Sequence, residues 1–390
     1  MKNVQKNSPA IILLIVLVGF PQISETIFTP ALPEISRDFH VTAQTAQLLM
    51  GSYFMAFAVG VLVWGQLSDR WGRRPTMLLG ILVYLIGNIG LFAAPEFSWL
   101  LLARLVQAFG ASVGSVVTQT IMRESFSGVK GAQVFAKVGG AMALAPALGP
   151  FIGGIIQQYF GFKSVCSVLI GMAIMILIYS YGKLPETMEP QATEQSVSIW
   201  QAAKILAQDK RVWAYAVLIA GINGILFSFY AEAPFVLMQM YGMDAMHYGI
   251  AGMMIALSSI VGAMCANYAV KYLTSYRIIM LSLLVSGLGV GVGCLSATMH
   301  SSLLFLVAFF IVFTGLNTIL PLVLNDALVG YENIIGTASG VFGFAYYVMI
   351  SLMTYGMSLM HNGTAFALPL YVGALIVLML ILTVTCLRKR

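Results

Sequence analysis

Two glutamates, Glu25 and Glu232, stand inside long apolar runs of the sequence, where an acidic residue is costly. Glu25 lies in "QISETIFTPALPEI", residues 22–35, about fifteen residues after the start of the run that begins at Ala10. An ionised carboxylate at the centre of a membrane costs roughly 2.5–3.5 kcal/mol on insertion scales. Such an acid needs a partner or a function, and the chemistry that suits it is the binding and release of a proton.

A third charge, Arg104, lies in the apolar stretch "LLARLVQAFGAS". Its guanidinium stays protonated, so we expect it to face a carboxylate or a water-filled cavity, although a snorkelling position at the membrane surface is an alternative. Burial favours the protonated form of a carboxyl group, and a nearby arginine favours the ionised form. We therefore predict a proton-coupling group of Glu25, Glu232 and Arg104. Asp326 is added to it, with pairing to Arg277 or capping of the next turn as the alternative.

The composition identifies the kind of protein that must hold these charges. Only 9% of the 390 residues are charged, against about 25% in soluble domains, and the apolar runs exceed the ~20 residues that a membrane-crossing helix needs. An all-α integral membrane protein is predicted, and the runs are too long for the short alternating strands of a β-barrel. Twelve transmembrane helices are predicted, at residues 10–33, 44–67, 76–94, 98–122, 132–159, 163–183, 211–240, 246–270, 276–298, 301–328, 335–360 and 366–387.

The spans divide into two halves around one long polar connector. We predict an N-terminal six-helix bundle at 1–183, a cytoplasmic linker at 184–210 and a C-terminal six-helix bundle at 211–390. With the N-terminus inside, all of the twenty Lys and Arg residues except Arg37, Arg104 and Lys163 fall on the cytoplasmic side, as the positive-inside rule requires. Both termini are therefore predicted to be cytoplasmic. Gly110 and Gly315, 205 residues apart in the fourth and tenth spans, suggest a duplication.

Other chemistries find little support in the sequence. The net charge of +6 follows from the distribution of basic residues in cytoplasmic loops and does not indicate a nucleic-acid partner. The four cysteines lie in apolar segments without metal-ligand spacing, and the four histidines stand near span ends. We expect no metal, no cofactor and no enzymatic activity.

The loop "GQLSDRWGRRP", residues 65–75, carries an acid and three arginines between the second and third spans. A basic loop that only fixes topology is one interpretation. The complete pattern resembles the signature loop of the major facilitator superfamily, and "LPETM" after span six resembles that family's PETL motif. The resemblance implies a latch between the two halves on the cytoplasmic face. Its predicted gating residues are Asp69, Arg70, Arg73, Glu124 and Glu186.

Two further motifs resemble those of the same superfamily. Arg104 and Gln107 match its RxxQG-type motif in span four. "GGAMALAPALGPFIGG", residues 139–154, resembles the span-five motif of drug:proton antiporters, with Gly149 and Pro150 as gating residues. Small residues that allow close helix packing are the simpler interpretation. The resemblance favours export over uptake.

The segments that hold the two glutamates resemble one branch of that superfamily. "SETIFTPALP" is similar to the "TDxYLPALP" first span of the Bcr/CflA (bicyclomycin/chloramphenicol resistance) branch of twelve-span antiporters. Glu25 stands one residue before that branch's acid, and Thr26 occupies its place. On one continuous helix Gln22, Glu25, Phe28 and Thr29 would share a face. "FYAEAPFVLMQMYG" is similar to the branch's "ISGSPFV" stretch, with Glu232 as an added acid, and we expect both glutamates to face one cavity between the halves.

The resemblance implies a drug/H+ antiporter of a bacterial inner membrane, which exports amphipathic, cationic small molecules by alternating access. Its partners would be substrate, protons and lipid, the proton gradient would drive it, and it would act as a monomer. An exporter of one metabolite, such as a siderophore, is the main alternative; an uptake symporter or a non-transport membrane protein is less favoured. The predicted substrate-binding residues are Gln22, Tyr53, Phe57, Gln107, Phe229, Tyr230, Asn317 and Tyr346.

Overall fold

The computed structural model describes residues 9–126, 128–188, 199–331 and 335–387. Twelve of its helices are long and apolar enough to cross a membrane, and their bounds agree with the predicted spans to within a few residues, except that the first continues to Asp38. The all-helical, twelve-span fold class is therefore confirmed. Part of the predicted linker (189–198) and the basic residues Lys2, Lys6, Arg388, Lys389 and Arg390 lie outside the described residues.

The helices fall into two groups along the chain. The first comprises α1 (Ile11–Thr26), the 3₁₀ turn η1 (Thr29–Ala31), α2 (Leu32–Asp38), α3 (Ala43–Trp71), α4 (Arg73–Phe92), α5 (Phe97–Ser125), α6 (Gly128–Phe160) and α7 (Phe162–Lys183). The second comprises α8 (Ile199–Gln208), α9 (Lys210–Pro234), the π-helical segment η2 (Phe235–Met240), α10 (Ala245–Ala269), α11 (Ser275–Thr298), α12 (Ser302–Asp326), α13 (Ile335–Met360), α14 (Ala367–Leu382) and η4 (Thr383–Leu387).

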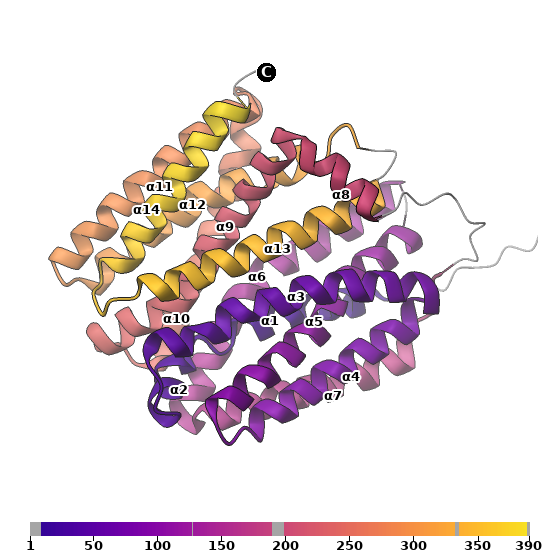
Figure 1. The fold of residues 1–390 in the computed structure, drawn as a ribbon, viewed down its shortest axis with the longest axis horizontal. Helices are drawn as coiled ribbons and strands as arrows, with labels where there is room; N and C mark the ends of the chain where they lie inside the picture. Colours follow the sequence, from indigo (N-terminus) through magenta and orange to yellow (C-terminus); the bar gives the residue numbers. More distant parts are fainter. Residues whose placement is uncertain (1–8, 127, 189–198, 332–334, 388–390) are drawn as a thin grey trace, which may run out of the picture.

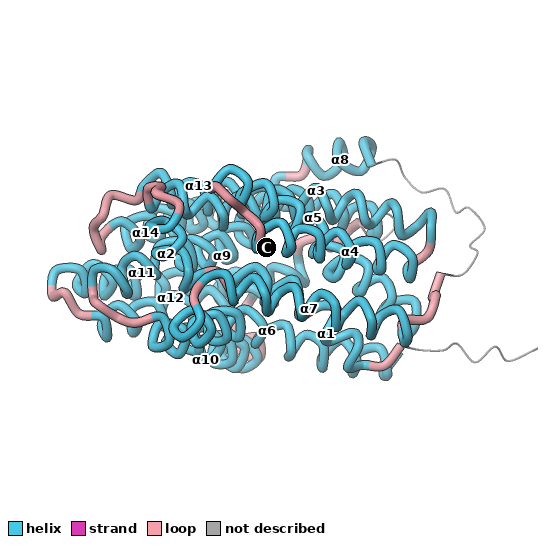
Figure 2. Tube along the Cα trace, turned by 90° about the horizontal axis from the view of Figure 1, so that it is seen from below, coloured by secondary structure: helices cyan, strands magenta, loops and turns pink. Residues whose placement is uncertain are grey.

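Two helix pairs join the halves. α3 packs against α13, and α6 packs against α10, while α4 with α7 and α11 with α14 lie on the outer sides of their bundles (Figure 1). The short α8 is not a membrane span; it lies outside the bundles and contacts α13 (Figure 2). The surface between the halves is therefore formed mainly by α3, α6, α10 and α13.

In the described structure, the hydrogen bonds that join the two halves lie toward one end of the molecule. We call this the distal end; it carries the turns at 39–42, 241–244 and 361–366, and the opposite, linker end is where α7 finishes and α9 starts. Toward the distal end, Gln44 Nε2 donates to the His361 carbonyl at 2.9 Å, and Ser351 Oγ donates to the Gly51 carbonyl at 2.8 Å. Toward the linker end, the end of α14 diverges from the ends of α4 and α7 (Figure 1).

The first membrane span is broken, and the break corrects one expectation. α1 ends at Thr26, a 3₁₀ turn follows at Thr29, and α2 starts at Leu32. Pro30 and Pro33 lack the N–H groups that a continuous helix would need there, and their rings clash with the preceding turn. The prediction that Gln22, Glu25, Phe28 and Thr29 share the face of one helix is therefore wrong.

Glycines set the closest helix contacts. A methyl group at Gly153 of α6 would overlap the Ile27 carbonyl oxygen at the break of the first span. Gly110 lets α5 approach the backbone of α4 at Tyr84, and Gly315 lets α12 approach the backbone of α11 in the same way. The glycines that suggested a duplication thus have equivalent packing positions in the two halves.

The contact at Gly153 generates a stability prediction. Gly153→Ala should destabilise the protein by about 1–3 kcal/mol, the usual cost of overpacking, because α6 must move away from Ile27. Gly139→Ala is the matched control, since a methyl group there meets open space on the same helix; it should leave stability unchanged or raise it slightly. Thermal unfolding of the purified protein in detergent measures both. Equal melting temperatures for the two variants would contradict the packing argument.

Candidate functional site

Arg104 of α5 caps the broken end of α1. Its Nη1 donates to the Ser24 carbonyl at 2.9 Å, and its Nη2 donates to the Glu25 carbonyl at 3.0 Å. The last carbonyl groups of a helix have no partners within the helix and carry partial negative charge. The guanidinium therefore supplies donors to acceptors that lipid could never satisfy.

Arg104 was expected to face a carboxylate or a water-filled cavity, and its surroundings are different. Its side chain is 1% exposed, so the snorkelling alternative is wrong. Its Cζ lies 4.3 Å from the ring centre of Tyr53 and 4.8 Å from that of Phe28, distances typical of cation–π contacts. Among the described residues no ion pair joins it to a carboxylate. The charge is balanced by helix carbonyls and aromatic faces, which the sequence prediction did not anticipate.

A buried polar network continues from Arg104 into the first bundle. Arg104 Nη1 donates to Gln107 Oε1 at 2.5 Å, and Gln107 Nε2 donates to Asn88 Oδ1 at 2.6 Å. Tyr84 and Ser24 share a hydroxyl–hydroxyl bond of 2.5 Å, and Asn88 Nδ2 donates to the Tyr84 carbonyl. Both polar groups of the Gln107 amide are thus engaged within this bundle, so its predicted substrate-binding role is not supported by its contacts. The sequence analysis did not identify Tyr84 and Asn88. Their spacing of four residues places two polar side chains on the same face of an apolar helix, which could have indicated a buried polar network.

The Glu25 side chain is the acid at the break of the first span. It is 7% exposed, and its carboxylate makes no hydrogen bond or ion pair with any residue in the described part of the chain. It lies close enough to interact electrostatically with the phenol groups of Tyr53, Tyr230 and Tyr347, from α3, α9 and α13. A carboxylate without a protein partner therefore lies between the halves, where it is free to bind a proton or a cation.

Glu232 has a different environment. It is fully buried in α9, Gln47 Nε2 of α3 donates to its Oε2 at 2.5 Å, and His361 Nδ1 lies 2.8 Å from its Oε1. No hydrogen bond or ion pair in the described structure joins Glu232 to Glu25, so the two acids are not partners. Sequence reasoning missed Gln47 and His361; the histidine's place at a span end was the available signal.

Asp326 lies far from either glutamate along the helix axes. It ends α12 at the linker end, accepts a hydrogen bond from Asn325 Nδ2 at 2.9 Å, and lines a cavity of about 400 Å³ with Asp209 and Arg211. The ion pairs of the described residues include none between Asp326 and Arg277. Its contacts do not support its assignment to the proton-coupling group.

The predicted substrate-binding residues divide into two sets. Phe229 packs inside the second bundle, with its ring 4.9 Å from Phe309 and 5.4 Å from Phe313, and Asn317 lies against Gly262 of α10. Phe229 and Gln107 are therefore buried within their bundles, and Asn317 is half-buried between α12 and α10 of the second bundle.

The second set lies where the halves meet. Phe57 packs against Tyr347 at 4.9 Å, Tyr346 stacks beside Tyr347, and Tyr230 donates to the Pro146 carbonyl at 3.1 Å. Tyr53, which covers Arg104, is also in this set, and Gln22, whose buried Oε1 has no donor, lies one turn before Glu25 on α1. The residues brought near Glu25 and the joint between the halves are Gln22, Tyr53, Phe57, Tyr230 and Tyr346.

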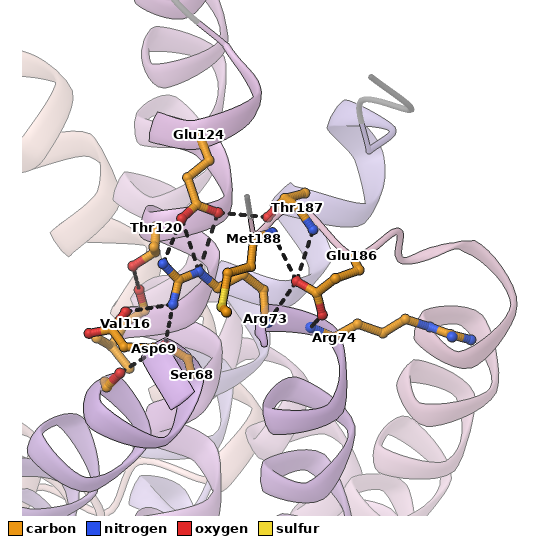
Figure 3. A network of polar contacts seen from close by, with 11 residues as sticks. Ser68, Asp69, Arg73, Arg74, Val116, Thr120, Glu124, Glu186, Thr187 and Met188 are labelled. Carbon is orange, nitrogen blue, oxygen red and sulfur yellow. Dashed lines mark hydrogen bonds and ion pairs between the residues drawn. The ribbon is translucent and has the colours of Figure 1, made fainter. Parts of the chain in front are cut away.

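At the linker end, Arg73 is the centre of a polar cluster (Figure 3). Its guanidinium pairs with Asp69 at 2.5 Å and with Glu124 at 2.6 Å. Glu186, after α7, accepts the backbone N–H groups of Arg73 at 2.9 Å and Arg74 at 3.0 Å. Burial raises the pKa of Glu186, but the N–H donors of Met188, Arg73, Arg74 and Thr187 outweigh this and lower it.

The position of this cluster changes the expected role of the loop. Its hydrogen bonds and ion pairs, as drawn in Figure 3, join α3, α4, α5 and the segment after α7, all before residue 189. Arg70, also predicted to be a gating residue, has an exposed side chain that makes no hydrogen bond or ion pair with another described residue. In the described part of the chain these contacts tie the helices of the first half together, and none of those in Figure 3 forms the latch between the halves that the resemblance implies. Gly149 and Pro150, on α6, pack against Thr26 and Gly249, as close helix packing requires.

Two six-span groups with buried charges near their junction define a class of protein, the secondary transporters. The Major Facilitator Superfamily model matches residues 14–354, and the chain belongs to this family. It is therefore a multi-pass membrane transporter, with a small-molecule substrate and a lipid bilayer around it.

Individual relatives and structures agree with this assignment. The chain is 32% identical, over 96% of its length and 93% of the relative's, to an uncharacterized transporter of Rickettsia bellii (strain RML369-C). It is 27% identical, over 93% of its length and 86% of the relative's, to a chloramphenicol resistance protein of Pseudomonas aeruginosa. A bacterial homolog of the human lysosomal transporter Spinster, solved in an inward-facing and occupied conformation, shares the fold with a TM-score of 0.73, 13% identity and 97% and 95% coverage of the two chains.

The Glu186 contacts predict a pH-dependent stability. Because its pKa is lowered in the folded protein, its stabilising effect is present above its unfolded pKa, about 4.3, and is lost as pH falls through the lower folded value. Glu186→Gln should lower the melting temperature at pH 7 by a few degrees, and the difference from wild type should shrink as pH falls below about 4. Glu96→Gln, an exposed acid at the distal end, is the control. A difference that does not change with pH would contradict the argument.

The cap on α1 predicts a larger effect for Arg104. Arg104→Gln leaves at least one of the Ser24 and Glu25 carbonyls without a donor, at about 1–3 kcal/mol each, so we expect a loss of about 2–4 kcal/mol. Arg123→Gln, at the exposed end of the same helix, should have little effect. Chemical unfolding in detergent measures both; a stable Arg104→Gln protein would show that the broken end of α1 does not need this cap.

Proposed function

We propose that the protein is a proton-coupled exporter, a drug/H+ antiporter of the Bcr/CflA branch, which moves amphipathic cationic molecules out of the cytoplasm across a bacterial inner membrane. The observation that supports this most directly is the Glu25 carboxylate, which has no partner in the described structure and lies between the two halves beside an arginine whose donors are directed at helix carbonyls. It acts as a monomer and draws its energy from the proton gradient.

Exchange follows from the charge of one carboxyl group. When Glu25 is ionised, it attracts a cationic substrate, and the rings of Tyr53, Phe57 and Tyr346 give that cation an aromatic surface. When Glu25 is protonated, that attraction is lost and the substrate is released. Arg104 stays bound to carbonyl groups in both states. Its positive charge therefore opposes permanent protonation of Glu25, although Arg104 forms no ion pair with the Glu25 carboxylate.

Alternating access supplies the direction of transport. The halves contact each other near the distal end and diverge at the linker end, which the distribution of basic residues predicts to be cytoplasmic. A cytoplasmic substrate then reaches Glu25 in this conformation, and an external proton reaches it when the distal end is open. Coupling requires that proton and substrate stabilise the two conformations differently. The Arg73 cluster holds the helices of the first bundle together as that bundle moves. The small surface at Gly149 and Pro150 lets α6 pack closely against α1 and α10.

Likeness to the Pseudomonas chloramphenicol resistance protein favours export of toxic compounds. An exporter of a single metabolite is the second candidate. The buried Gln22 Oε1, which has no donor in the structure, favours it because a site with a free acceptor selects for one ligand with a matching donor. A transport profile restricted to one compound would establish this second candidate.

Proteoliposomes with an imposed pH gradient test the proton coupling. The wild type should exchange protons for a cationic dye such as ethidium, seen as substrate-induced dissipation of the gradient, and Glu25→Gln should reduce that exchange by at least about tenfold, since it removes the titrating group. Glu96→Gln should behave as wild type. Undiminished proton-coupled flux in Glu25→Gln would overturn the proposal, as would flux that does not respond to the gradient.

A further inference from the structure

The distal contact between the halves contains a buried acid–base pair. Glu232, in α9, lies 2.8 Å from Nδ1 of His361, which follows the last residue of α13. α3 of the opposite half reaches this pair with two amides: Gln47 Nε2 donates to Glu232 at 2.5 Å, and Gln44 Nε2 donates to the His361 carbonyl at 2.9 Å. Each member of the pair is therefore bound across the junction.

The pair is shielded from water and from other charges. Glu232 is fully buried, the His361 side chain is 14% exposed, and the Phe235 ring lies 5.7 Å from the imidazole. The other titratable groups toward this end, on α9 and on the elements that pack against it or against η2, include Glu34, Arg37 and Asp38 of α2, Tyr53 of α3, Tyr230 of α9, Tyr248 of α10, Tyr355 of α13 and Tyr371 of α14. None of them makes a hydrogen bond or ion pair with Glu232 or His361 in the described structure; Glu34 bonds instead to Gln157 and to the Phe162 N–H.

We propose that His361 and Glu232 form a proton-operated gate of the transport cycle, closed when His361 carries a proton and Glu232 is ionised. A buried carboxylate whose partners are only a neutral imidazole and one amide is poorly compensated. An imidazolium supplies the missing charge and a charge-assisted hydrogen bond. The proton passes from the distal compartment to the imidazole, and no covalent bond forms besides that N–H.

The physical consequence is a link between pH and conformation. In the closed contact the imidazolium lies against a buried carboxylate, whereas in the open contact water surrounds that carboxylate, so a lower distal pH shifts the population toward closure. Without the proton, the Glu232 carboxylate is stabilised by water, which requires the distal contact to open. This inference rests on the proposed proton coupling and adds a second proton site, at the distal contact.

A distance measurement tests the gate without any substrate. We would replace the four native cysteines, place spin labels at the exposed positions Asp38 and Met299 on the two halves, and record distance distributions in lipid nanodiscs from pH 5.5 to 8.5. The ratio of closed to open populations should rise as pH falls, by up to about tenfold per pH unit for one linked proton. The same measurement in a Glu25→Gln protein removes any contribution from the Glu25 carboxyl group. The change of label distances with pH should persist in that protein.

Three variants complete the experiment. His361→Asn places an amide near the position of Nδ1 but carries no charge, and Glu232→Gln removes the carboxylate; each should abolish the pH dependence. His300→Asn, another histidine of the distal end with a positive φ that asparagine tolerates, should behave as wild type. Melting temperatures establish that each variant folds.

The outcomes separate this inference from the proposed function. A wild type whose distances do not change with pH, or a folded His361→Asn protein that keeps the wild-type dependence, would overturn the gate whatever the transport assays show. If the wild-type protein showed no proton-coupled flux in proteoliposomes, the antiport proposal would be overturned, even if the label distances depended on pH.

Discussion

The organisation of the first bundle depends on how the broken end of α1 is satisfied inside a membrane. Pro30 and Pro33 interrupt the helix, and the carbonyls of Ser24 and Glu25 then need donors that lipid does not supply. Arg104 supplies them. Its charge is thereby stabilised by a helix terminus, and it forms no ion pair that would neutralise Glu25. One set of hydrogen bonds therefore fixes the break and leaves an acid free at the junction of the halves.

The two halves use polar groups differently. The first bundle concentrates them, in the Arg104 network and in the Arg73 cluster at the linker end. The second bundle contributes Glu232 and His361, whose bonds cross to α3 near the distal end. The charges of the Arg73 cluster and the Arg104 network are thus held within one bundle, whereas the Glu232–His361 pair lies at a contact between the halves, made by α3, that alternating access must break. This division is what a moving junction between rigid bundles requires.

The sequence predicted the helices better than it predicted the contacts of its charged residues. Low charge and long apolar runs were sufficient for twelve spans, because a membrane leaves the backbone few alternatives. Motif resemblance brought Arg73, Glu124 and Glu186 together but assigned them to a latch between halves that the contacts do not show. Gln107 and Phe229 were predicted to bind substrate, and each is buried within its bundle; Asn317, predicted likewise, lies against α10 within the second bundle. The type of a residue determines which interactions its side chain can make, whereas the rotation of its helix determines which neighbours that side chain contacts.

The sequence alone therefore determined the class of protein, the number and limits of the spans and the presence of costly charges at membrane depth, since these depend on composition and local periodicity. The tertiary structure decided the partners. Arg104 lies 79 residues from the Glu25 carbonyl that it caps, and His361 lies 129 residues from Glu232. Such pairs form only when helices from distant parts of the chain pack together, and the geometry of that packing is set by many small contacts, glycines among them, that no single motif encodes.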